Sequence, residues 1–326
     1  MRVYYRREEV PRGVARAVTI GTFDGVHLGH QELLRHLCNR ASALGIRSCV
    51  LTFEPHPQLV LGKRPLPGVL TPLPEKLQHL QRAGVEEVFV VHFSQEFSRL
   101  SPEEFAQEYL QHTLQPQLIV VGYDHMFGHE RRGNAALLRQ MGFAVEELPP
   151  VLLEGEPVSS SRIRRLLQEG NVAAARRLLG YPYTVCGIVV RGDGRGRRLG
   201  FPTANLQPSH REKLLPAYGI YVASTTVQGI PRFGLLSYGV RPTFGATTPQ
   251  LELYLLDFEG SLYNEWLCVS FWERVRAEER FPTVEHLIAQ MRRDEAFCRV
   301  WLAQHKAEVE SLTSAFVGDA EQGTQG

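Results

Sequence analysis

Cysteine is scarce in this chain, with five among 326 residues, at Cys38, Cys49, Cys186, Cys268 and Cys298. No CxxC pair occurs, which argues against a zinc or dithiol site, so we expect reduced, mostly buried thiols. Apolar runs of bilayer length are also missing, and the N-terminal MRVYYRREEV is not followed by an apolar segment. We therefore expect a cytoplasmic protein with no membrane partner.

An excess of charge of either sign is missing too. Lys and Arg number 36 and Asp and Glu 35, so no global field attracts nucleic acid or an anionic membrane. We expect no nucleic-acid partner, and any phosphate binding must rest on local groups. The length suits two domains, each able to bury its own core. Nothing in the sequence specifies an oligomeric state.

The stretch from Val18 to about Leu148 alternates short β-rich apolar runs with helical patterns. The runs are AVTIG, SCVLTF, EVFVVHF, LIVVG and FAVEEL. Such alternation is typical of a doubly wound parallel sheet, so we predict a Rossmann-like α/β domain. Ser101, Pro102 and Glu104 predict a helix start with a capping box. Two further helices are expected over RIRRLLQEG and NVAAARRLLG, each closed by a glycine.

Beyond Tyr181 and Pro182 the pattern changes to strand-like runs separated by Gly- and Pro-rich turns. The runs are TVCGIVV, GIYVASTTV, RFGLLSYGV, LELYLLDF and WLCVSFWERV, which predict a small antiparallel β-barrel or sandwich. From Thr283 onward, helical periodicity predicts a terminal helix or two on the barrel. We therefore expect an α/β domain over 1–182, a barrel domain over 183–313 and a disordered polar tail over 314–326.

The segment GTFDGVHLGH, Gly21 to His30, follows a predicted strand and precedes an amphipathic run. A glycine-bearing turn that opens a helix presents backbone N–H groups and the positive end of the helix dipole to an anion. His27 and His30 can donate hydrogen bonds to oxygens that gain charge during phosphoryl transfer. The alternative is one helix-capping and one surface histidine. The position after a strand favours a nucleotide site that includes Gly21, Phe23 and Asp24.

Two other segments of the α/β domain offer groups for phosphate. Ser160, Ser161 and Arg162, in VSSSRIR, supply hydroxyl, backbone N–H and guanidinium groups at a predicted helix start. An ordinary N-cap followed by solvated arginines is the alternative. Asp124 follows the LIVVG strand, at the edge where open α/β sheets bind ligands. A turn-forming aspartate is its alternative.

The loop GDGRGRRLGFPTANL, residues 192–206, is rich in glycine and carries three arginines between two predicted strands. Its N–H and guanidinium groups could surround phosphates, so Gly192, Gly196 and Gly200 are candidate nucleotide-binding residues. The loop is neither a Walker motif nor GxGxxG, which argues against a P-loop kinase and a Rossmann dehydrogenase. A flexible basic hairpin remains the alternative.

Glu252 interrupts the apolar run LELYLL and alternates with Tyr254 and Leu256 on one face of the predicted strand. A carboxylate at the edge of a barrel pocket can accept a proton from an attacking alcohol. The alternative is an outward-facing strand glutamate.

Together these motifs resemble the bacterial bifunctional riboflavin kinases and FAD synthetases. GTFDGVHLGH is similar to the HxGH signature of nucleotidyltransferases, and LTFEPHP, VVGYDHMFG and VSSSRIRRLL resemble later motifs of the family's adenylyltransferase module. PTAN (202–205), GVRPTF (239–244) and VRAEERF (275–281) resemble motifs of its kinase module. The chain departs from the family at His125, where an aromatic residue is usual, at Ser161 for threonine and at Asn264 for glycine.

The resemblance implies ATP, riboflavin and FMN as substrates, with Mg²⁺ as cofactor. It implies that Thr203 and Asn205 hold Mg²⁺ with ATP phosphates, that Glu252 is the catalytic base, and that Arg276 lies near the flavin. Ser160, Ser161 and Arg162 would bind ATP phosphates opposite the histidines. Riboflavin would thus become FMN at the barrel, and FMN would become FAD at the α/β domain. Two alternatives are a pure nucleotidyltransferase with a regulatory barrel, and a flavin- or RNA-binding barrel with a decayed transferase.

Overall fold

The computed structural model describes residues 1–62, 66–192, 194, 196, 199–240 and 249–317, with side chains described as far as residue 312. The chain divides into two compact units, Met1–Ser160 and Ser161–Gly326. Each unit has its own sheet and core, so the two are described separately.

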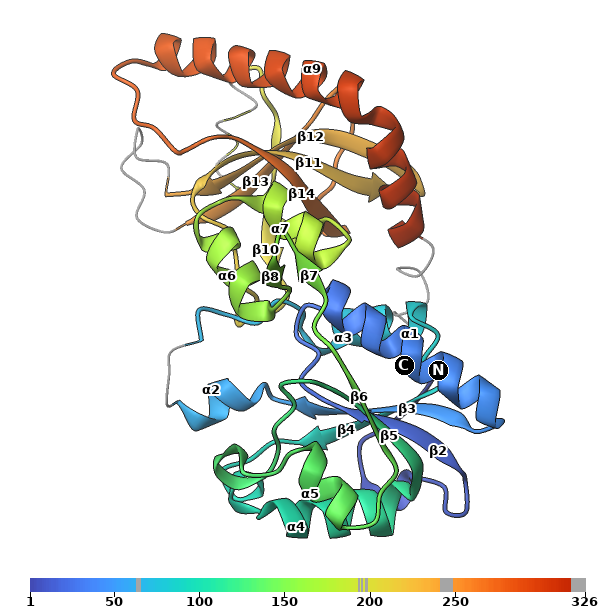
Figure 1. Cartoon of the computed structure of the whole chain (residues 1–326). Coiled ribbons are helices and arrows are strands. Elements are labelled where there is room, and N and C mark those ends of the chain that lie inside the picture. Colours follow the sequence, from blue (N-terminus) through green and yellow to red (C-terminus); the bar gives the residue numbers. More distant parts are fainter. Residues whose placement is uncertain (63–65, 193, 195, 197–198, 241–248, 318–326) are drawn as a thin grey trace. The chain divides into compact units, whose positions relative to one another are not determined.

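The first unit is built on one parallel sheet in the strand order β1-β4-β3-β2-β5-β6 (Figure 1). Its strands are β1 (Arg2–Tyr4), β2 (Arg16–Ile20), β3 (Arg47–Glu54), β4 (Glu87–His92), β5 (Pro116–Gly122) and β6 (Val145–Leu148). The central strands β2, β3 and β5 are apolar and largely buried on both faces, as expected for a sheet covered by helices. The predicted doubly wound parallel sheet is confirmed.

Helices cover both faces of this sheet. The helices α1 (Leu28–Leu44) and α3 (Leu73–Arg82) lie over one face, and α4 (Pro102–Phe105) and α5 (Ala135–Gln140) over the other (Figure 1). A π-helical segment, Ala106–Leu114, continues α4. Short elements complete the unit: α2 (Pro57–Leu61), single turns at Arg7–Glu9, Phe97–Arg99 and His129–Arg131, and the hairpin β7 (Leu152–Leu153) and β8 (Glu156–Pro157). The predicted capping box at Ser101 and Glu104 is confirmed.

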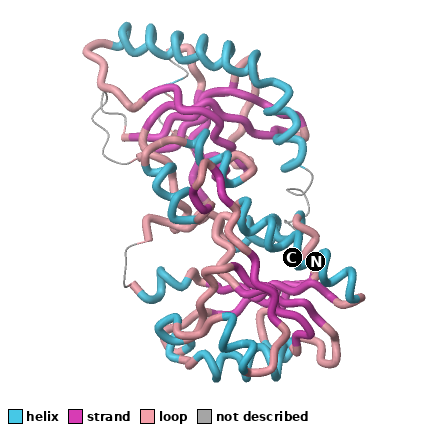
Figure 2. The backbone as a smooth tube through the Cα atoms, in the orientation of Figure 1, coloured by secondary structure: helices cyan, strands magenta, loops and turns pink. Residues whose placement is uncertain are grey.

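The second unit is a closed antiparallel barrel, and Figure 2 draws its strands in magenta. The strand order around the barrel is β10-β13-β12-β11-β14-β9. Its strands are β9 (Tyr183–Val190), β10 (Thr203–Pro208), β11 (Gly219–Val227), β12 (Ile230–Gly239), β13 (Gln250–Leu255) and β14 (Trp266–Arg276). The helices α6 (Ser160–Gln168) and α7 (Val172–Leu179) precede it. The predicted barrel is confirmed, but β10 was not predicted, since it begins within the glycine-rich segment 192–206.

One long helix, α9 (Val284–Val317), covers part of the barrel wall (Figure 1). Trp272 of β14, Cys298 and Trp301 lie in the core between helix and strands. Of the predicted polar tail, residues 314–317 belong to α9, and residues 318–326 lie outside the described residues. None of the helices within the described ranges has the length and apolarity needed to cross a membrane.

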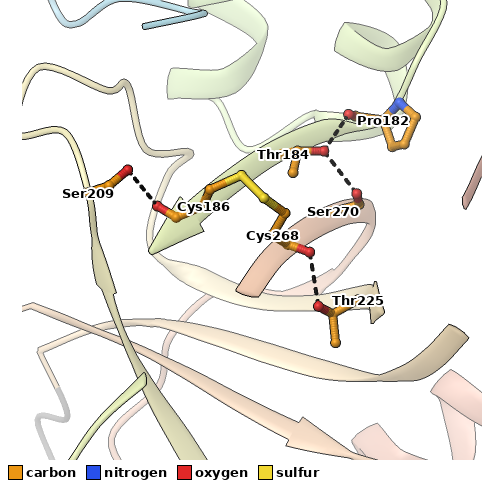
Figure 3. The surroundings of a disulfide bond; sticks show 7 residues. All are labelled: Pro182, Thr184, Cys186, Ser209, Thr225, Cys268 and Ser270. Atoms are coloured by element: carbon orange, nitrogen blue, oxygen red, sulfur yellow. Dashed lines mark hydrogen bonds between the residues drawn. A yellow bond between two sulfur atoms is a disulfide. The ribbon is translucent and has the colours of Figure 1, made fainter. Parts of the chain in front are cut away.

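Cysteine pairing differs from the expectation of reduced thiols. Cys186 of β9 and Cys268 of β14 are direct cross-strand partners with Cα atoms 4.0 Å apart, and they form a disulfide (Figure 3). The prediction failed because it considered local spacing, whereas barrel closure brings together two positions 82 residues apart. Cys38, Cys49 and Cys298 are free thiols, and the last two are buried.

Candidate active sites

Strands β2 and β5 mark the point where the chain reverses direction across the parallel sheet. From β2 the chain continues to β3 and β4 on one side, and β5 and β6 lie on the other. Open α/β sheets bind ligands at the carboxyl ends of the strands beside such a point. The segment Gly21–His30 follows β2 and Asp124 follows β5, so both lie at this edge.

The loop before α1 has a constrained backbone. Phe23, Gly25 and Val26 have φ angles of 48°, 87° and 29°, in the left-handed region that is costly for residues with side chains. Phe23 and Val26 are each 1% exposed and belong to the core that α1 covers. The N–H of Gly25 donates to Thr71 Oγ1 at 2.8 Å. The surrounding packing and this hydrogen bond therefore constrain the loop.

His27 and His30 lie side by side at the start of α1. Their rings stack with centroids 3.7 Å apart and planes at 16°, and the Phe23 ring lies 5.1 Å from His30. His27 also caps α1, since its Nδ1 accepts a hydrogen bond from the His30 N–H at 3.4 Å. A Cβ at Gly29 would lie 3.2 Å from the His27 ring, so glycine leaves room for it. The structure thus brings the two histidines together, and one of them does cap the helix.

His30 is placed as a neutral hydrogen-bond donor. Its Nδ1 is buried and lacks a hydrogen-bond partner within the described part of the chain. Burial, followed by the neighbouring His27 and the ammonium group of Lys76, lowers the pKa of His30 well below its ordinary value. A neutral imidazole carries one N–H, and beside a helix N-terminus it suits oxygens that gain negative charge.

Asp24 connects three segments of the first unit. Its buried carboxylate accepts hydrogen bonds from the N–H groups of Leu70 and Thr71, each at 2.9 Å, just before α3. The Ser160 hydroxyl donates to the Asp24 carbonyl oxygen at 2.7 Å. These contacts make Asp24 an anchor of the loop, and its direct contact with a nucleotide stays a prediction.

The other residues predicted for this site occupy surface or second-unit positions. Asp124 is exposed in the turn after β5, Ser161 is exposed, and Arg162 is half-buried in the first turn of α6. His125 stacks on Phe127 at 5.8 Å, and its buried Nε2 is without a partner among the residues described. Burial lowers the pKa of His125 to about 4, so this ring is neutral at physiological pH.

Sequence reasoning missed Lys76, a lysine of α3 that is 2% exposed. Its Nζ lies 3.5 Å from Thr52 Oγ1 and 3.4 Å from the Phe53 carbonyl oxygen, at the carboxyl end of β3. A signal was present in the sequence, because Lys76 shares the helical stripe formed by Leu73, Leu77 and Leu80. A lysine at a core position of an amphipathic helix is unusual.

In the barrel, strand register gathers the residues predicted for the kinase. Asn205 of β10 lies directly opposite Glu252 of β13, and Thr203 lies opposite Tyr254. Directly opposed residues of antiparallel strands project from the same face, so these four side chains share one face of the sheet. The other face carries Leu251 and Leu253, which are buried. Glu252 and the two PTAN residues are therefore neighbours.

Glycines bring the loop after β9 against these residues. A Cβ at Gly192 would lie 2.1 Å from Asn205 Nδ2, and one at Gly196 would lie 3.0 Å from Thr203 Oγ1. Gly200 has a φ of 84°, which favours glycine. The three arginines of this loop, and residues 241–244 of GVRPTF, lie outside the described residues.

Arg276 at the end of β14 is engaged within the second unit. Its guanidinium group donates to Asp294 of α9 at 2.8 and 3.0 Å and lies over the Phe281 ring, 5.5 Å from its centroid. Asp294 is 3% exposed. This ion pair holds the segment after β14 to α9, and contact of Arg276 with a flavin stays a prediction.

The donor atoms near Glu252 suit a hard cation. Thr203 and Asn205 offer hydroxyl and amide oxygens, which fit Mg²⁺ when phosphate and water supply its remaining ligands. Across the ranges that the structure describes, no group of three or more His, Cys, Asp or Glu residues could hold a metal by itself.

Comparison with family models gives one match for each half of the chain. Residues 11–162 match the FAD synthetase family, and residues 179–302 match the riboflavin kinase family. The matches cover the Gly21–His30 loop in one case, and PTAN with Glu252 in the other.

Curated relatives extend over nearly the whole chain. A bifunctional riboflavin kinase/FMN adenylyltransferase from Listeria monocytogenes is 36% identical over 296 residues, covering 89% of this chain and 94% of the relative. The Pseudomonas fluorescens protein of the same name is 38% identical over 290 residues, covering 87% and 92%. A crystal structure described as a macrolide-efflux protein from Streptococcus pneumoniae has a TM-score of 0.83 and 32% identity, covering 91% of this chain and 98% of that one.

Proposed function

The chain belongs to the bifunctional riboflavin kinase/FMN adenylyltransferase family, and from that premise we propose which residues carry each of its two reactions. It is an enzyme that phosphorylates riboflavin to FMN and adenylylates FMN to FAD, using ATP in both steps. Because residues 179–302 match a riboflavin kinase, the alternative of a purely regulatory barrel is wrong.

Adenylyl transfer is assigned to the carboxyl edge of the parallel sheet. A phosphate oxygen of FMN attacks the α-phosphorus of ATP, the bond from that phosphorus to the bridging oxygen breaks, and pyrophosphate leaves. Because the FMN phosphate is already ionised, no protein base is required, and positioning with charge stabilisation suffices. His27 and His30 donate hydrogen bonds to the charged oxygens. The proposed nucleotide-binding residues are Gly21, Phe23, Asp24, Asp124, Ser160, Ser161 and Arg162.

Riboflavin phosphorylation is assigned to the face shared by β10 and β13. The ribityl hydroxyl attacks the γ-phosphorus of ATP, its proton passes to Glu252, and ADP leaves. An alcohol is a poor nucleophile at neutral pH, so this step needs a base where the other does not. The loop with Gly192, Gly196 and Gly200 would close over the phosphates, and Arg276 would lie near the flavin.

Mg²⁺ is proposed as the cofactor of the kinase reaction, with Thr203 and Asn205 as its protein ligands. The ion would neutralise charge on the ATP phosphates during transfer. The spacing of the two residues on one strand face supports this assignment, because alternate residues project from the same side.

The observation that carries the kinase assignment is the register that sets Glu252 opposite Asn205. This register supports the proposal, because it places the proposed base beside the proposed metal ligand. Domain limits of 1–182 and 183–313 are proposed for the two activities, since the adenylyltransferase requires the Ser160–Arg162 segment. A cytoplasmic location and the absence of a nucleic-acid partner also stay predictions.

Incubation with riboflavin, ATP and Mg²⁺, followed by chromatographic separation of the flavins, tests both assignments. The wild-type chain should yield FMN and then FAD. Glu252→Ala should abolish FMN formation and still convert added FMN to FAD, whereas the double variant His27→Ala, His30→Ala should stop at FMN. If either variant lost both activities while folded, the assignment of two separate sites would be wrong.

A further inference from the structure

Lys76 is a buried cation that the two assigned reactions do not use. Burying an ammonium group costs free energy unless charges and hydrogen bonds compensate. Its hydrogen-bond acceptors are the Thr52 hydroxyl and the Phe53 carbonyl, both neutral and at the long distances of 3.5 and 3.4 Å. An apolar side chain would pack at this core position without that cost, so the charge itself calls for an explanation.

The contacts of Lys76 lead to the nucleotide loop by two routes. By the first route, the Thr52 hydroxyl accepts a hydrogen bond from the Lys76 ammonium group and donates one to the Thr22 carbonyl oxygen at 3.2 Å. By the second route, Asp24 holds the N–H groups of Leu70 and Thr71, just before the helix that carries Lys76. The lysine is thus fixed relative to the loop that presents His27 and His30.

The charges around Lys76 also point to this loop. Burial lowers the pKa of Lys76, while the carboxylates of Asp24 and Glu54 act in the opposite direction. Lys76 and His27 are the charged or titratable neighbours that lower the pKa of His30 in addition to burial. The His56 ring also faces this group of charges, with its Nε2 4.0 Å from Asp24 Oδ2. Two carboxylates therefore lie close to a site proposed to bind a polyphosphate.

We propose that Lys76 is a positioning residue for adenylyl transfer, whose buried ammonium group offsets Asp24 and Glu54 and holds the end of β3 against the Gly21–His30 loop. Without this charge, the two carboxylates would oppose the phosphates of ATP. Its charge also disfavours protonation of His30, which therefore stays a neutral donor. The inference rests on the proposed role of the histidines in this reaction.

The test compares three substitutions at one position. Lys76→Met removes the charge and the hydrogen bonds, Lys76→Gln removes the charge but can still donate, and Lys76→Arg keeps the charge. Leu80→Met, a volume-conserving change at a buried position of the same helix, is the matched control. The kinase activity of each variant serves as an internal reference, because it is assigned to the barrel.

We expect Lys76→Met and Lys76→Gln to lower kcat/KM for ATP in FMN adenylylation about tenfold, which corresponds to about 1.4 kcal/mol of lost transition-state stabilisation. Riboflavin phosphorylation should stay unchanged, Lys76→Arg should recover most of the loss, and Leu80→Met should resemble the wild type. NMR titration of the His30 ring should give a higher pKa in Lys76→Gln than in the wild type, in Lys76→Arg and in Leu80→Met, so that the increase follows the charge at position 76.

Wild-type adenylylation by Lys76→Gln, or an unchanged His30 titration, would overturn the inference. So would a Lys76→Arg variant as impaired as Lys76→Gln. If Lys76→Met does not fold, the Gln and Arg variants still decide the matter. The double variant His27→Ala, His30→Ala distinguishes failure of the proposed site from failure of the role of Lys76. If the double variant still makes FAD, the proposed adenylylation site is wrong. If it stops at FMN while Lys76→Gln is normal, only the proposed role of Lys76 is wrong.

Discussion

Asp24 is proposed to bind the nucleotide, and its hydrogen bonds also make it an anchor of the loop before α1. Its Oδ1 accepts from the backbone N–H groups of Leu70 and Thr71, and the side chain is 2% exposed. Asp24→Asn keeps one acceptor oxygen but removes the charge, and its amide group must face donors or water. We therefore expect the loop to lose its anchor even though the side chains are nearly the same size.

The cost follows from the hydrogen bonds. Two bonds to a carboxylate become neutral, at about 1 kcal/mol each, and a mismatched buried donor adds roughly 1–2 kcal/mol. The first unit should thus lose about 3–4 kcal/mol of stability. With an m-value of about 2 kcal/mol/M, its urea midpoint should fall by about 1.5–2 M.

The chain provides separate probes for its two units. All three tryptophans, Trp266, Trp272 and Trp301, belong to the second unit, so tryptophan fluorescence reports on the barrel. Residual adenylylation of added FMN after incubation in urea reports on the first unit. Asp24→Asn should lower the urea midpoint of adenylylation and leave the midpoint of the fluorescence curve unchanged. An unchanged adenylylation midpoint with a raised KM for ATP would refute the anchor and favour a direct ligand.

Two further predictions concern Glu87 in the first unit and Gly192 in the second. Glu87 accepts from Arg16 and Arg47 at 2.6 Å each, inside the first unit, so Glu87→Gln should cost about 3–5 kcal/mol by leaving buried Arg16 unpaired. Burial raises the pKa of Glu87, but the two guanidinium groups outweigh burial and lower it. The ion pairs therefore stabilise the first unit fully above the carboxyl pKa of the unfolded chain, and this stabilisation is lost as the pH falls through the lowered pKa of the folded state. If Glu87→Gln had the same acid-unfolding midpoint as the wild type, this reasoning would be contradicted. Gly192→Ala should push Asn205 aside and lower riboflavin phosphorylation about a hundredfold, as a displacement of about 1 Å can, with FMN adenylylation as the unaffected control; a normal kinase rate would show that the loop need not contact Asn205.

Much of the fold could be predicted because its periodicities are local. The apolar runs of β2, β3, β4 and β5 and the capping box at Ser101 are contiguous signals, and they give the parallel sheet and its helices. Strand β10 escaped because its residues, Thr203–Pro208, show no apolar alternation and follow a glycine-rich loop. Strand β1, with three residues at the sheet edge, is too short for any periodic signal.

The candidate sites divide in the same way. Residues that would touch a substrate stand in compact motifs, and their types alone suggest phosphate or metal chemistry, as with His27, His30 and PTAN. Residues that hold those motifs in place are recruited from distant positions by the fold. Asp24 reaches residues 46 and 47 positions away, and Ser160 reaches back 136 positions to the Asp24 carbonyl. No spacing rule predicts such contacts.

The two reactions differ in what they require from the protein, and the two sites are built accordingly. The FMN phosphate is ionised before it attacks, so the first site needs no base, and its cost lies in assembling negative groups beside one another. A strained loop, two stacked histidines of which His30 is neutral, and a buried lysine are suited to stabilising those negative groups. The riboflavin hydroxyl must instead lose a proton, and Glu252, the proposed base, lies opposite Asn205, the proposed metal ligand. Substitutions of the buried residues that support the Gly21–His30 loop, such as Asp24 and Lys76, should therefore lower the rate of FAD formation more than the rate of FMN formation.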